Sequence, residues 1–278
     1  MNKVKAVVAF HSGYGHTKKQ AESVAAGIAG AGGVGVQLIN VADLNAGEIP
    51  VFVPPPKAAP KPGGIIMFGD STTAPRGSVK VYATRVETAL QSIGSSLGVH
   101  NAGIPGNTTR DALKRLQTDV LKYQPRIVVM QFGINDSAMD VWKTPPATAS
   151  RVPLDEYLSN LRRMIAAAQQ AKAKVILMTT NPLRWTSKLR ELYGKPPYNP
   201  AAEDGFDSAT LAGYNEALRQ LTAELKVPLV DVRAAYPDFA AKHQTTIEGM
   251  LLDGMHPNDL GQQLVAELLV PAIRGVLR

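Results

Sequence analysis

Two separated stretches of the sequence hold the residue types of a serine nucleophile and its base. Gly69-Asp70-Ser71 directly follows the apolar run 65–68. A serine hydroxyl is a weak nucleophile, so it needs a neighbouring base to take its proton. Serine and aspartate after a strand are also ordinary turn and helix-capping residues. This stretch alone therefore indicates catalysis only weakly.

A candidate base, His256, lies near the other end of the chain, three residues after Asp253. On a turn, this spacing lets the carboxylate accept a hydrogen bond from Nδ1–H and leaves Nε2 free, while Pro257 keeps His256 out of a helical conformation. A histidine held only for structural reasons is the alternative interpretation. With Ser71, the pair supplies a nucleophile, a base and an orienting carboxylate.

Two further stretches offer donors for the oxyanion that forms when a serine attacks a carbonyl. Gly106, within 101–108, has no Cβ to block a carbonyl beside its N–H. Asn135, after the run 127–132, carries two neutral N–H donors. The Ser71 N–H points into the site if a helix begins soon after it. A tight strand-to-helix turn at Gly106 and an Asx turn at Asn135 are the alternatives.

The elements expected to position these residues alternate between short apolar runs and amphipathic segments. Strands are predicted at 65–68, 99–104, 127–132, 175–178 and 229–232. Apolar residues spaced three and four apart predict helices at 79–90, 113–121, 154–165 and 211–225, and a last helix begins at 259. This order predicts an α/β fold with a mostly parallel sheet and helices on both faces. Ligands bind such sheets beyond the carboxyl ends of the strands.

A break in composition divides the chain into three parts. Residues 45–64 contain six prolines and end in two glycines, which is typical of a semi-rigid extended linker. We expect a small fragment over 1–44, a linker over 45–62 and a catalytic domain over 63–278. Only the last part has the size of an ordinary domain.

Composition excludes several classes of function. The 278 residues include no cysteine, so a disulfide, a thiolate metal site and a cysteine nucleophile are excluded. The net charge of +7 could steer an anionic substrate, but basic residues without interleaved aromatics favour a solvated basic face and no nucleic-acid partner. The apolar runs are too short to span a membrane, and no cleavage site follows the first of them. We expect a cytoplasmic protein with no membrane partner.

The four stretches resemble the conserved blocks of SGNH hydrolases, the superfamily of GDSL esterases and lipases. The blocks occur in the family's order at 69–71, 101–108, 133–136 and 253–256, with Thr72 where the GDSL motif has leucine. The resemblance implies a three-layer α/β/α fold with a flavodoxin-like sheet. It also implies that Ser71 is the nucleophile, His256 the general base and then acid, and Asp253 the orienting carboxylate. The oxyanion hole would be formed by the N–H groups of Ser71 and Gly106 and by the Asn135 side chain, with no metal or cofactor.

The substrate is less well defined by the sequence. The superfamily includes arylesterases, thioesterases, lysophospholipases and carbohydrate O-deacetylases. The segments 142–153 and 185–208 are candidate pocket walls, and the alternative interpretation is that their aromatic side chains pack an irregular loop onto the sheet. We expect short-chain esters, with acetylated carbohydrates as a natural class, and substrate contacts from Asp70, Asn107 and Trp185. A thioesterase, a lysophospholipase and an inactive carbohydrate-binding module are the alternatives.

Residues 1–44 contain a strand candidate at 5–10, an amphipathic stretch at 18–28 and a second strand candidate at 36–41. This βαβ order resembles the start of flavodoxin-like proteins of the NAD(P)H:quinone oxidoreductase branch, in which the first loop binds the FMN phosphate. Ser12, Gly15, His16 and Thr17 would be the phosphate contacts. The later strands are missing, so we do not expect FMN to be retained; a flavin-binding redox protein is the alternative. A fragment this small is expected to pair with a second copy in a homo-oligomer.

Overall fold

The computed structural model describes residues 4–10, 34–40, 62–208 and 210–278, and the chain divides into two compact units, Met1–Ala58 and Ala59–Arg278. In the first unit, β1 (Val4–Phe10) and β2 (Val34–Asn40) pair in parallel, with Val4 opposite Val34. Parallel pairing of these two strands is what a βαβ order requires. The amphipathic stretch predicted at 18–28 lies outside the described residues.

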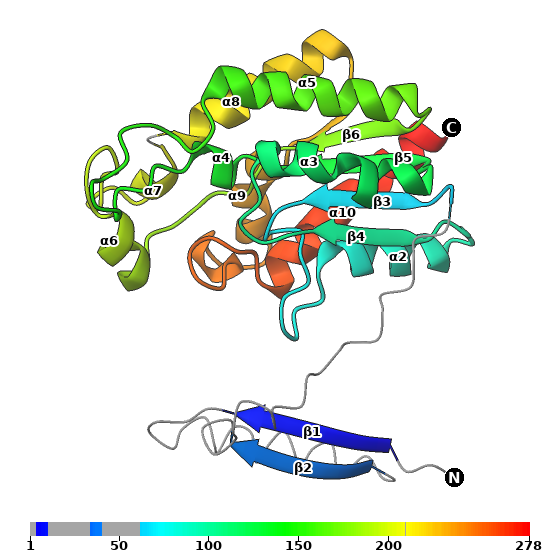
Figure 1. The fold of residues 1–278 in the computed structure, drawn as a ribbon, viewed down its shortest axis with the longest axis horizontal. Coiled ribbons are helices and arrows are strands. Elements are labelled where there is room, and N and C mark those ends of the chain that lie inside the picture. The colour runs from blue at the N-terminus through cyan, green and yellow to red at the C-terminus, as the bar shows by residue number, and fades with distance from the viewer. Residues whose placement is uncertain (1–3, 11–33, 41–61, 209) are drawn as a thin grey trace. The chain divides into compact units, whose positions relative to one another are not determined.

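The second unit contains a five-stranded sheet in the order β4-β3-β5-β6-β7, and all neighbouring strands are parallel (Figure 1). The strands are β3 (Ile65–Gly69), β4 (Val99–Gly103), β5 (Ile127–Gln131), β6 (Lys174–Met178) and β7 (Leu229–Val230). The predicted α/β fold with a parallel sheet is confirmed. The last strand is shorter than predicted, because the Asp231 side chain accepts a hydrogen bond from the Ala234 N–H and starts a helix.

Helices cover both faces of this sheet. One face packs against α2 (Tyr82–Ser92), α9 (Val232–Lys242) and α10 (Asp259–Leu277). The other packs against α3 (Thr109–Asp119), α5 (Leu154–Gln170) and α8 (Leu211–Leu225). Within β3, Ile65 and Met67 point into the first core and Ile66 and Phe68 into the second. Because both faces are buried, the strand reads as a continuous apolar run.

By length and composition, α10 is the one helix among the described residues that could cross a membrane. Its buried side chains Leu264, Val265, Leu269 and Ile273 belong to the core cluster that packs on the sheet. The apolar face of α10 is therefore used inside the fold.

A third and smaller apolar cluster is formed mainly by the segment that follows β6, and Figure 1 shows the course of that segment. The segment 185–208, predicted as irregular, contains α6 (Ser187–Tyr193) and α7 (Gly205–Ser208). Its aromatic residues pack on one another, with ring centroids 5.0 Å apart for Trp185 and Phe206 and 5.5 Å apart for Tyr193 and Tyr198. We call this group the satellite cluster; it also contains Ile134, Val141, Leu183, Leu189 and Leu211.

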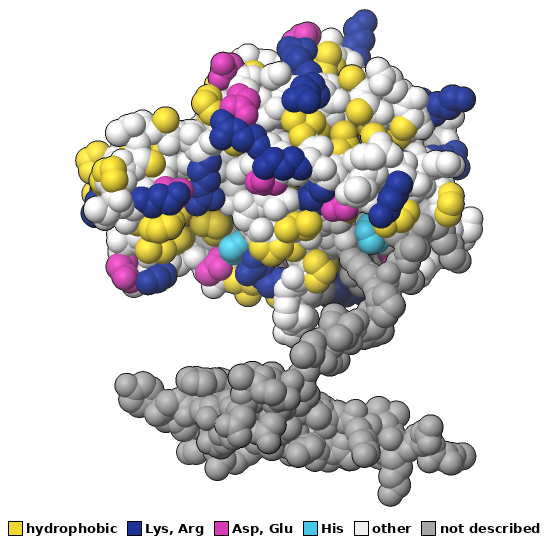
Figure 2. Space-filling model, viewed as in Figure 1, with side chains coloured by type: hydrophobic (Ala, Val, Ile, Leu, Met, Phe, Trp, Pro, Cys, Tyr) yellow, Lys and Arg dark blue, Asp and Glu magenta, His cyan; other side chains and the backbone are white. Residues whose placement is uncertain are grey.

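The short elements complete the second unit. They are α4 (Ile134–Ser137) and the 3-10 helices η2 (Leu121–Tyr123) and η3 (Glu248–Met250). Lysine and arginine side chains are spread over the visible face among other residues and do not gather in one patch (Figure 2). This distribution is that of a solvated surface.

Candidate active site

Ser71, His256 and Asp253 form a hydrogen-bonded line at the carboxyl end of the sheet. His256 Nε2 lies 2.9 Å from Ser71 Oγ, and its Nδ1 lies 2.8 Å from Asp253 Oδ2. Ser71 belongs to the turn after β3, while the other two residues belong to the loop before α10. The fold therefore brings together a hydroxyl, an imidazole and a carboxylate in the arrangement needed to activate the hydroxyl.

The loop that carries the histidine is shaped by Asp253 itself. Asp253 Oδ1 accepts hydrogen bonds from the backbone N–H groups of Met255 (3.1 Å) and His256 (2.9 Å). Partial burial raises the pKa of Asp253, but the hydrogen bonds from His256 and the loop N–H groups outweigh it and hold the pKa below its usual value. The carboxylate is thus ionised and oriented toward Nδ1.

Contacts from the segment after β6 fix the same loop from outside. Asn181 Nδ2 donates to the Met255 carbonyl at 2.9 Å, and the Arg184 N–H donates to the Gly254 carbonyl at 2.7 Å. Gly254 has φ +81°, and a Cβ there would lie 2.2 Å from the Arg184 carbonyl oxygen. Only glycine permits this close approach.

The turn that carries Ser71 is held by buried hydrogen bonds. The Asp70 carbonyl accepts from the N–H groups of Thr73 (3.3 Å) and Ala74 (3.0 Å). The buried hydroxyl of Thr72 lies 3.0 Å from Gln131 Oε1, a contact that leucine at this position could not make. The first helix after the turn, α2, begins only at Tyr82. This start lies close to the predicted one at 79, and the Ser71 N–H belongs to the turn between β3 and that helix.

Asp70 lies beneath the site, where its side chain is 1% exposed. Its Oδ1 accepts from the Thr72 N–H at 2.9 Å, and its Oδ2 lies 3.4 Å from Asn135 Nδ2. Burial raises the pKa of this carboxyl, against the opposing effect of the Thr72 hydrogen bonds. We expected a substrate contact at Asp70, but its burial gives it a supporting position between Ser71 and Asn135.

The side chain of Asn135 contacts the loop that carries Gly106, as an oxyanion site requires. Asn135, on α4, donates from Nδ2 to the Asn107 carbonyl at 3.1 Å. Gly106 is exposed with φ +76°, and a Cβ there would meet nothing within 4 Å. Glycine is therefore required at 106 for its backbone conformation, a reason separate from the room for a carbonyl that the sequence led us to expect.

An arginine of α3 joins these loops. Arg115, 11% exposed, donates from Nη2 to the Gly69 carbonyl (2.9 Å) and from Nη1 to the Ala102 carbonyl (2.8 Å). Its Nε donates to Asn107 Oδ1 at 2.6 Å, and the guanidinium lies 4.4 Å from the centre of the Phe68 ring. The Asn107 side chain, expected to contact substrate, is thus engaged by Arg115.

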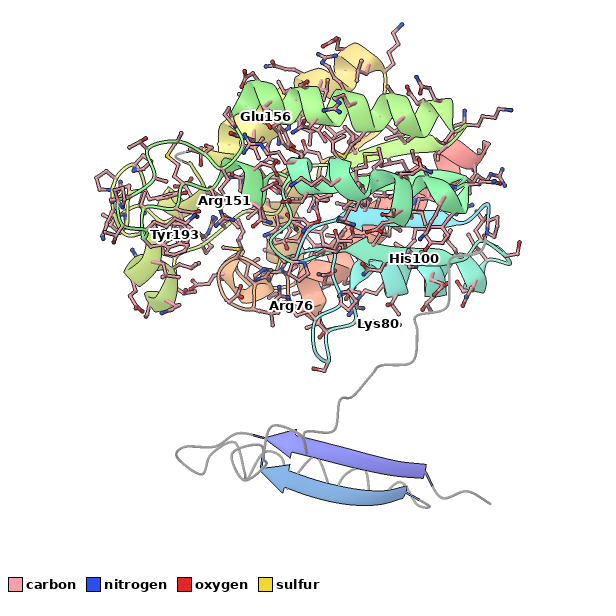
Figure 3. The ribbon with its side chains drawn as sticks, viewed as in Figure 1. Arg76, Lys80, His100, Arg151, Glu156 and Tyr193 are labelled. Atoms are coloured by element: carbon pink, nitrogen blue, oxygen red, sulfur yellow. The ribbon has the colours of Figure 1, made fainter. Side chains whose placement is uncertain are left out.

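A pocket of about 360 Å³, including the solvent at its mouth, opens beside Asn135. Arg151 and Tyr193, both labelled in Figure 3, line it together with Tyr198, Phe206 and Met255. Both segments proposed as pocket walls contribute to it. Trp185 takes a packing position in the satellite cluster, where it is 5% exposed and its indole N–H donates to the Asn199 carbonyl at 3.0 Å. Because Trp185 is buried, its side chain is not available for the substrate contact that we expected.

Within the described parts of the chain, no group of three or more histidine and acidic residues is arranged to hold a metal ion. The residues named for the FMN phosphate, Ser12, Gly15, His16 and Thr17, lie outside the described residues.

Comparison with known proteins gives one family and several relatives. Residues 67–264 match the model of the GDSL-like Lipase/Acylhydrolase family. The lipoprotein YqeF of Bacillus subtilis is 31% identical over 219 residues, which cover 73% of this chain and 86% of that protein. An acetylxylan esterase from Geobacillus stearothermophilus is 28% identical over 198 residues, covering 69% and 80% of the two chains. The crystal structure of a lipase/acylhydrolase from Enterococcus faecalis superposes with a TM-score of 0.58 at 27% identity, covering 77% of this chain and 96% of that one.

Proposed function

The chain belongs to the GDSL-like lipase/acylhydrolase family and is a carboxylic ester hydrolase, and we propose that it acts on acetyl and other short-chain esters. The observation that carries the proposal is the 2.9 Å contact between Ser71 Oγ and His256 Nε2, in line with Asp253. We further propose acetylated carbohydrates as the natural substrate class.

The proposed reaction proceeds through an acyl-enzyme on Ser71. Ser71 Oγ attacks the ester carbonyl while His256 Nε2 takes the hydroxyl proton, and Asp253 stabilises the imidazolium that forms. The tetrahedral intermediate collapses, the C–O bond to the alcohol breaks, and His256 returns the proton to the leaving alcohol. Water then attacks the acyl-enzyme with His256 again as base, which releases the carboxylic acid and restores Ser71.

The oxyanion of the tetrahedral intermediate would accept hydrogen bonds from the N–H groups of Ser71 and Gly106 and from Asn135 Nδ2. In the free enzyme, Asn135 Nδ2 lies 3.1 Å from the Asn107 carbonyl and 3.4 Å from Asp70 Oδ2. The second contact is long, so the hydrogen that makes it is only weakly engaged and is the one available to the oxyanion. A donor that gains its partner only in the transition state raises kcat more than it affects KM.

Two observations support a short acyl group or a compact alcohol. The pocket beside Asn135 is small and is closed by Tyr193, Tyr198 and Phe206, which are themselves packed in the satellite cluster. The relative from Geobacillus stearothermophilus is an acetylxylan esterase. Thioester and lysophospholipid hydrolysis are the alternative activities.

A series of p-nitrophenyl esters from acetyl to lauroyl, assayed beside acetylated sugars, tests the substrate class. We expect kcat/KM to be highest for the acetyl ester and to fall as the acyl chain grows. A maximum at long acyl chains would contradict the proposal and favour the lysophospholipase alternative. Saccharide binding without turnover would favour the inactive binding module.

The catalytic residues are tested by Ser71→Ala and His256→Ala, with Ser92→Ala as the matched control. Ser92 is exposed on α2 and its hydroxyl donates only to a carbonyl of its own helix. We expect the first two variants to lose turnover with the fold intact, and a serine-directed phosphonate to inactivate the native enzyme. Wild-type turnover by either variant would reject the assignment.

For residues 1–44 we propose a βαβ fragment that serves as an oligomerisation arm. Within the described residues, β1 and β2 pair only with each other, and an unpaired strand edge can template pairing with another chain. Deleting residues 1–62 and measuring the mass in solution tests this, because an unchanged oligomer refutes it. Flavin absorbance of the purified full-length protein would instead favour the flavodoxin-like redox alternative.

A further inference from the structure

The side-chain amide of Asn135 has partners that accept only one orientation. An arginine can only donate hydrogen bonds, and Arg151 Nη1 donates to Asn135 Oδ1 at 3.2 Å. A carbonyl can only accept, and the Asn107 carbonyl faces Asn135 Nδ2 at 3.1 Å. A flipped amide would set two nitrogens against each other on one side and two oxygens on the other. The orientation shown places the N–H₂ end toward the loops of Ser71 and Gly106.

Arg151 is itself held in place by a buried carboxylate. Its Nη2 and Nε donate to Asp140 Oδ1 at 2.6 and 3.0 Å, and Asp140 is almost fully buried. Three of the guanidinium's N–H groups thus have fixed acceptors, two on Asp140 and one on Asn135. Its planar fork binds two acceptors at once, which an ammonium group cannot do with the same geometry.

The backbone around Arg151 ties this guanidinium to the element that carries the amide. The Arg151 N–H donates to the Ala138 carbonyl at 2.9 Å, and the next N–H, of Val152, donates to the Asp136 carbonyl at 3.0 Å. Arg110 Nη1 donates to the Arg151 carbonyl at 2.8 Å. The loop 138–153 is therefore fastened directly onto α4.

We propose that Arg151 is a positioning residue for the oxyanion site: it fixes the Asn135 amide with its N–H₂ end toward the developing oxyanion, and Asp140 holds Arg151 for this task. The inference rests on the proposed function. Arg151, labelled in Figure 3, touches no reacting atom in this role and acts through its hydrogen bond to Asn135. Its charge also polarises the amide, because hydrogen bonds in a chain strengthen one another.

The test is a double-mutant cycle with Arg151→Met and Asn135→Ala, measured as kcat and KM for p-nitrophenyl acetate. Asn135→Ala is expected to lower kcat by about 10² to 10³, the usual effect of removing an oxyanion donor. Arg151→Met is expected to lower kcat by about tenfold, equal to about 1.4 kcal/mol of transition-state stabilisation, and to leave KM nearly unchanged. In the Asn135→Ala background it should have no further effect on kcat.

Arg162→Met is the matched control, because Arg162 is exposed on α5 and pairs with Glu224 away from the site. We expect its kcat to equal that of the wild type. Arg151→Lys keeps the charge but cannot hold Asn135 and Asp140 together, so its kcat should lie between those of wild type and Arg151→Met. Urea denaturation of each variant separates these effects from unfolding; if Arg151→Met does not fold, the cycle is run with Arg151→Lys.

The outcomes distinguish this inference from the proposed function. Wild-type kcat in Arg151→Met, or a loss of the same factor with and without Asn135, would overturn the positioning role while leaving the hydrolase assignment in place. Full turnover in Ser71→Ala would overturn the assignment itself.

Discussion

Replacing Asp253 by asparagine tests how much the carboxylate contributes to the His256 base. The asparagine keeps an oxygen that can accept from the N–H groups of Met255 and His256, so the loop should keep its shape. What is lost is the negative charge 2.8 Å from His256 Nδ1. The amide nitrogen that replaces Oδ2 can also donate to His256 Nδ1 and favour the other tautomer of the imidazole, so the variant tests the charge and the tautomer together.

The exposure of Asp253 sets the size of the effect. Two unit charges 4 Å apart attract by about 1 kcal/mol in water and by about 4 kcal/mol near a protein surface. Because the side chain of Asp253 is 50% exposed, we take a value between these limits, about 3 kcal/mol, which corresponds to a loss of about 10² in kcat. In a serine protease, where the aspartate is buried and the asparagine imposes the wrong tautomer on the histidine, the same change costs about 10⁴.

The assay is kcat for p-nitrophenyl acetate at neutral pH, with Asp238→Asn, an exposed position on α9, as the control. A loss below about threefold would mean that the charge does not act on His256. A loss as large as that of His256→Ala would mean that partial exposure does not weaken the interaction, contrary to our reasoning.

Other predictions concern the supports of the site. Gly106→Ala should cost about 1 to 2 kcal/mol of stability for the left-handed conformation and lower kcat, whereas Gly98→Ala, where a Cβ also meets nothing within 4 Å, should do neither in the same assays. Arg115→Met should lower the free energy of unfolding in urea by about 3 kcal/mol, because the Ala102 carbonyl loses its guanidinium donor and the Gly69 carbonyl keeps only the Ile104 N–H; an unchanged urea midpoint would contradict this role of Arg115. Burial raises the pKa of Asp136 to about 6, so the folded state binds a proton more tightly than the unfolded chain, and stability should fall as pH rises from about 4 to about 6. Asp136→Asn should flatten this part of the profile in urea titrations at several pH values, and an unchanged profile would show that another group is responsible.

The strands and the site triad follow from signals that are local in the sequence. A central parallel strand such as β5 is buried on both faces, so it appears as an unbroken apolar run bounded by polar residues. The residues that carry chemistry then stand at the ends of such runs, as Ser71 and Asn135 do. Their types and positions are enough to predict that they share one edge of the sheet.

Other features had no local signal. The helix α9 was not predicted, because Pro237 lies inside it and its first residue, Val232, continues the apolar run of β7. The roles of Arg115 and Arg151 depend on carbonyl and amide oxygens that the folded chain brings to them, 46 residues away for Gly69 and 16 for Asn135. An arginine in a helix or loop is most often solvated, so its type alone predicts a surface position.

The satellite cluster gives the enzyme a way to change its substrate preference. It packs beside the sheet as a separate apolar group, while the strands and the turn of Ser71 are braced by other contacts. Mutations at Leu183, Tyr193, Tyr198 and Phe206 can therefore reshape the cavity while the sheet and the turn of Ser71 keep their own supports. Natural variants, or a laboratory library confined to these four positions, can therefore accept new esters with the same catalytic residues.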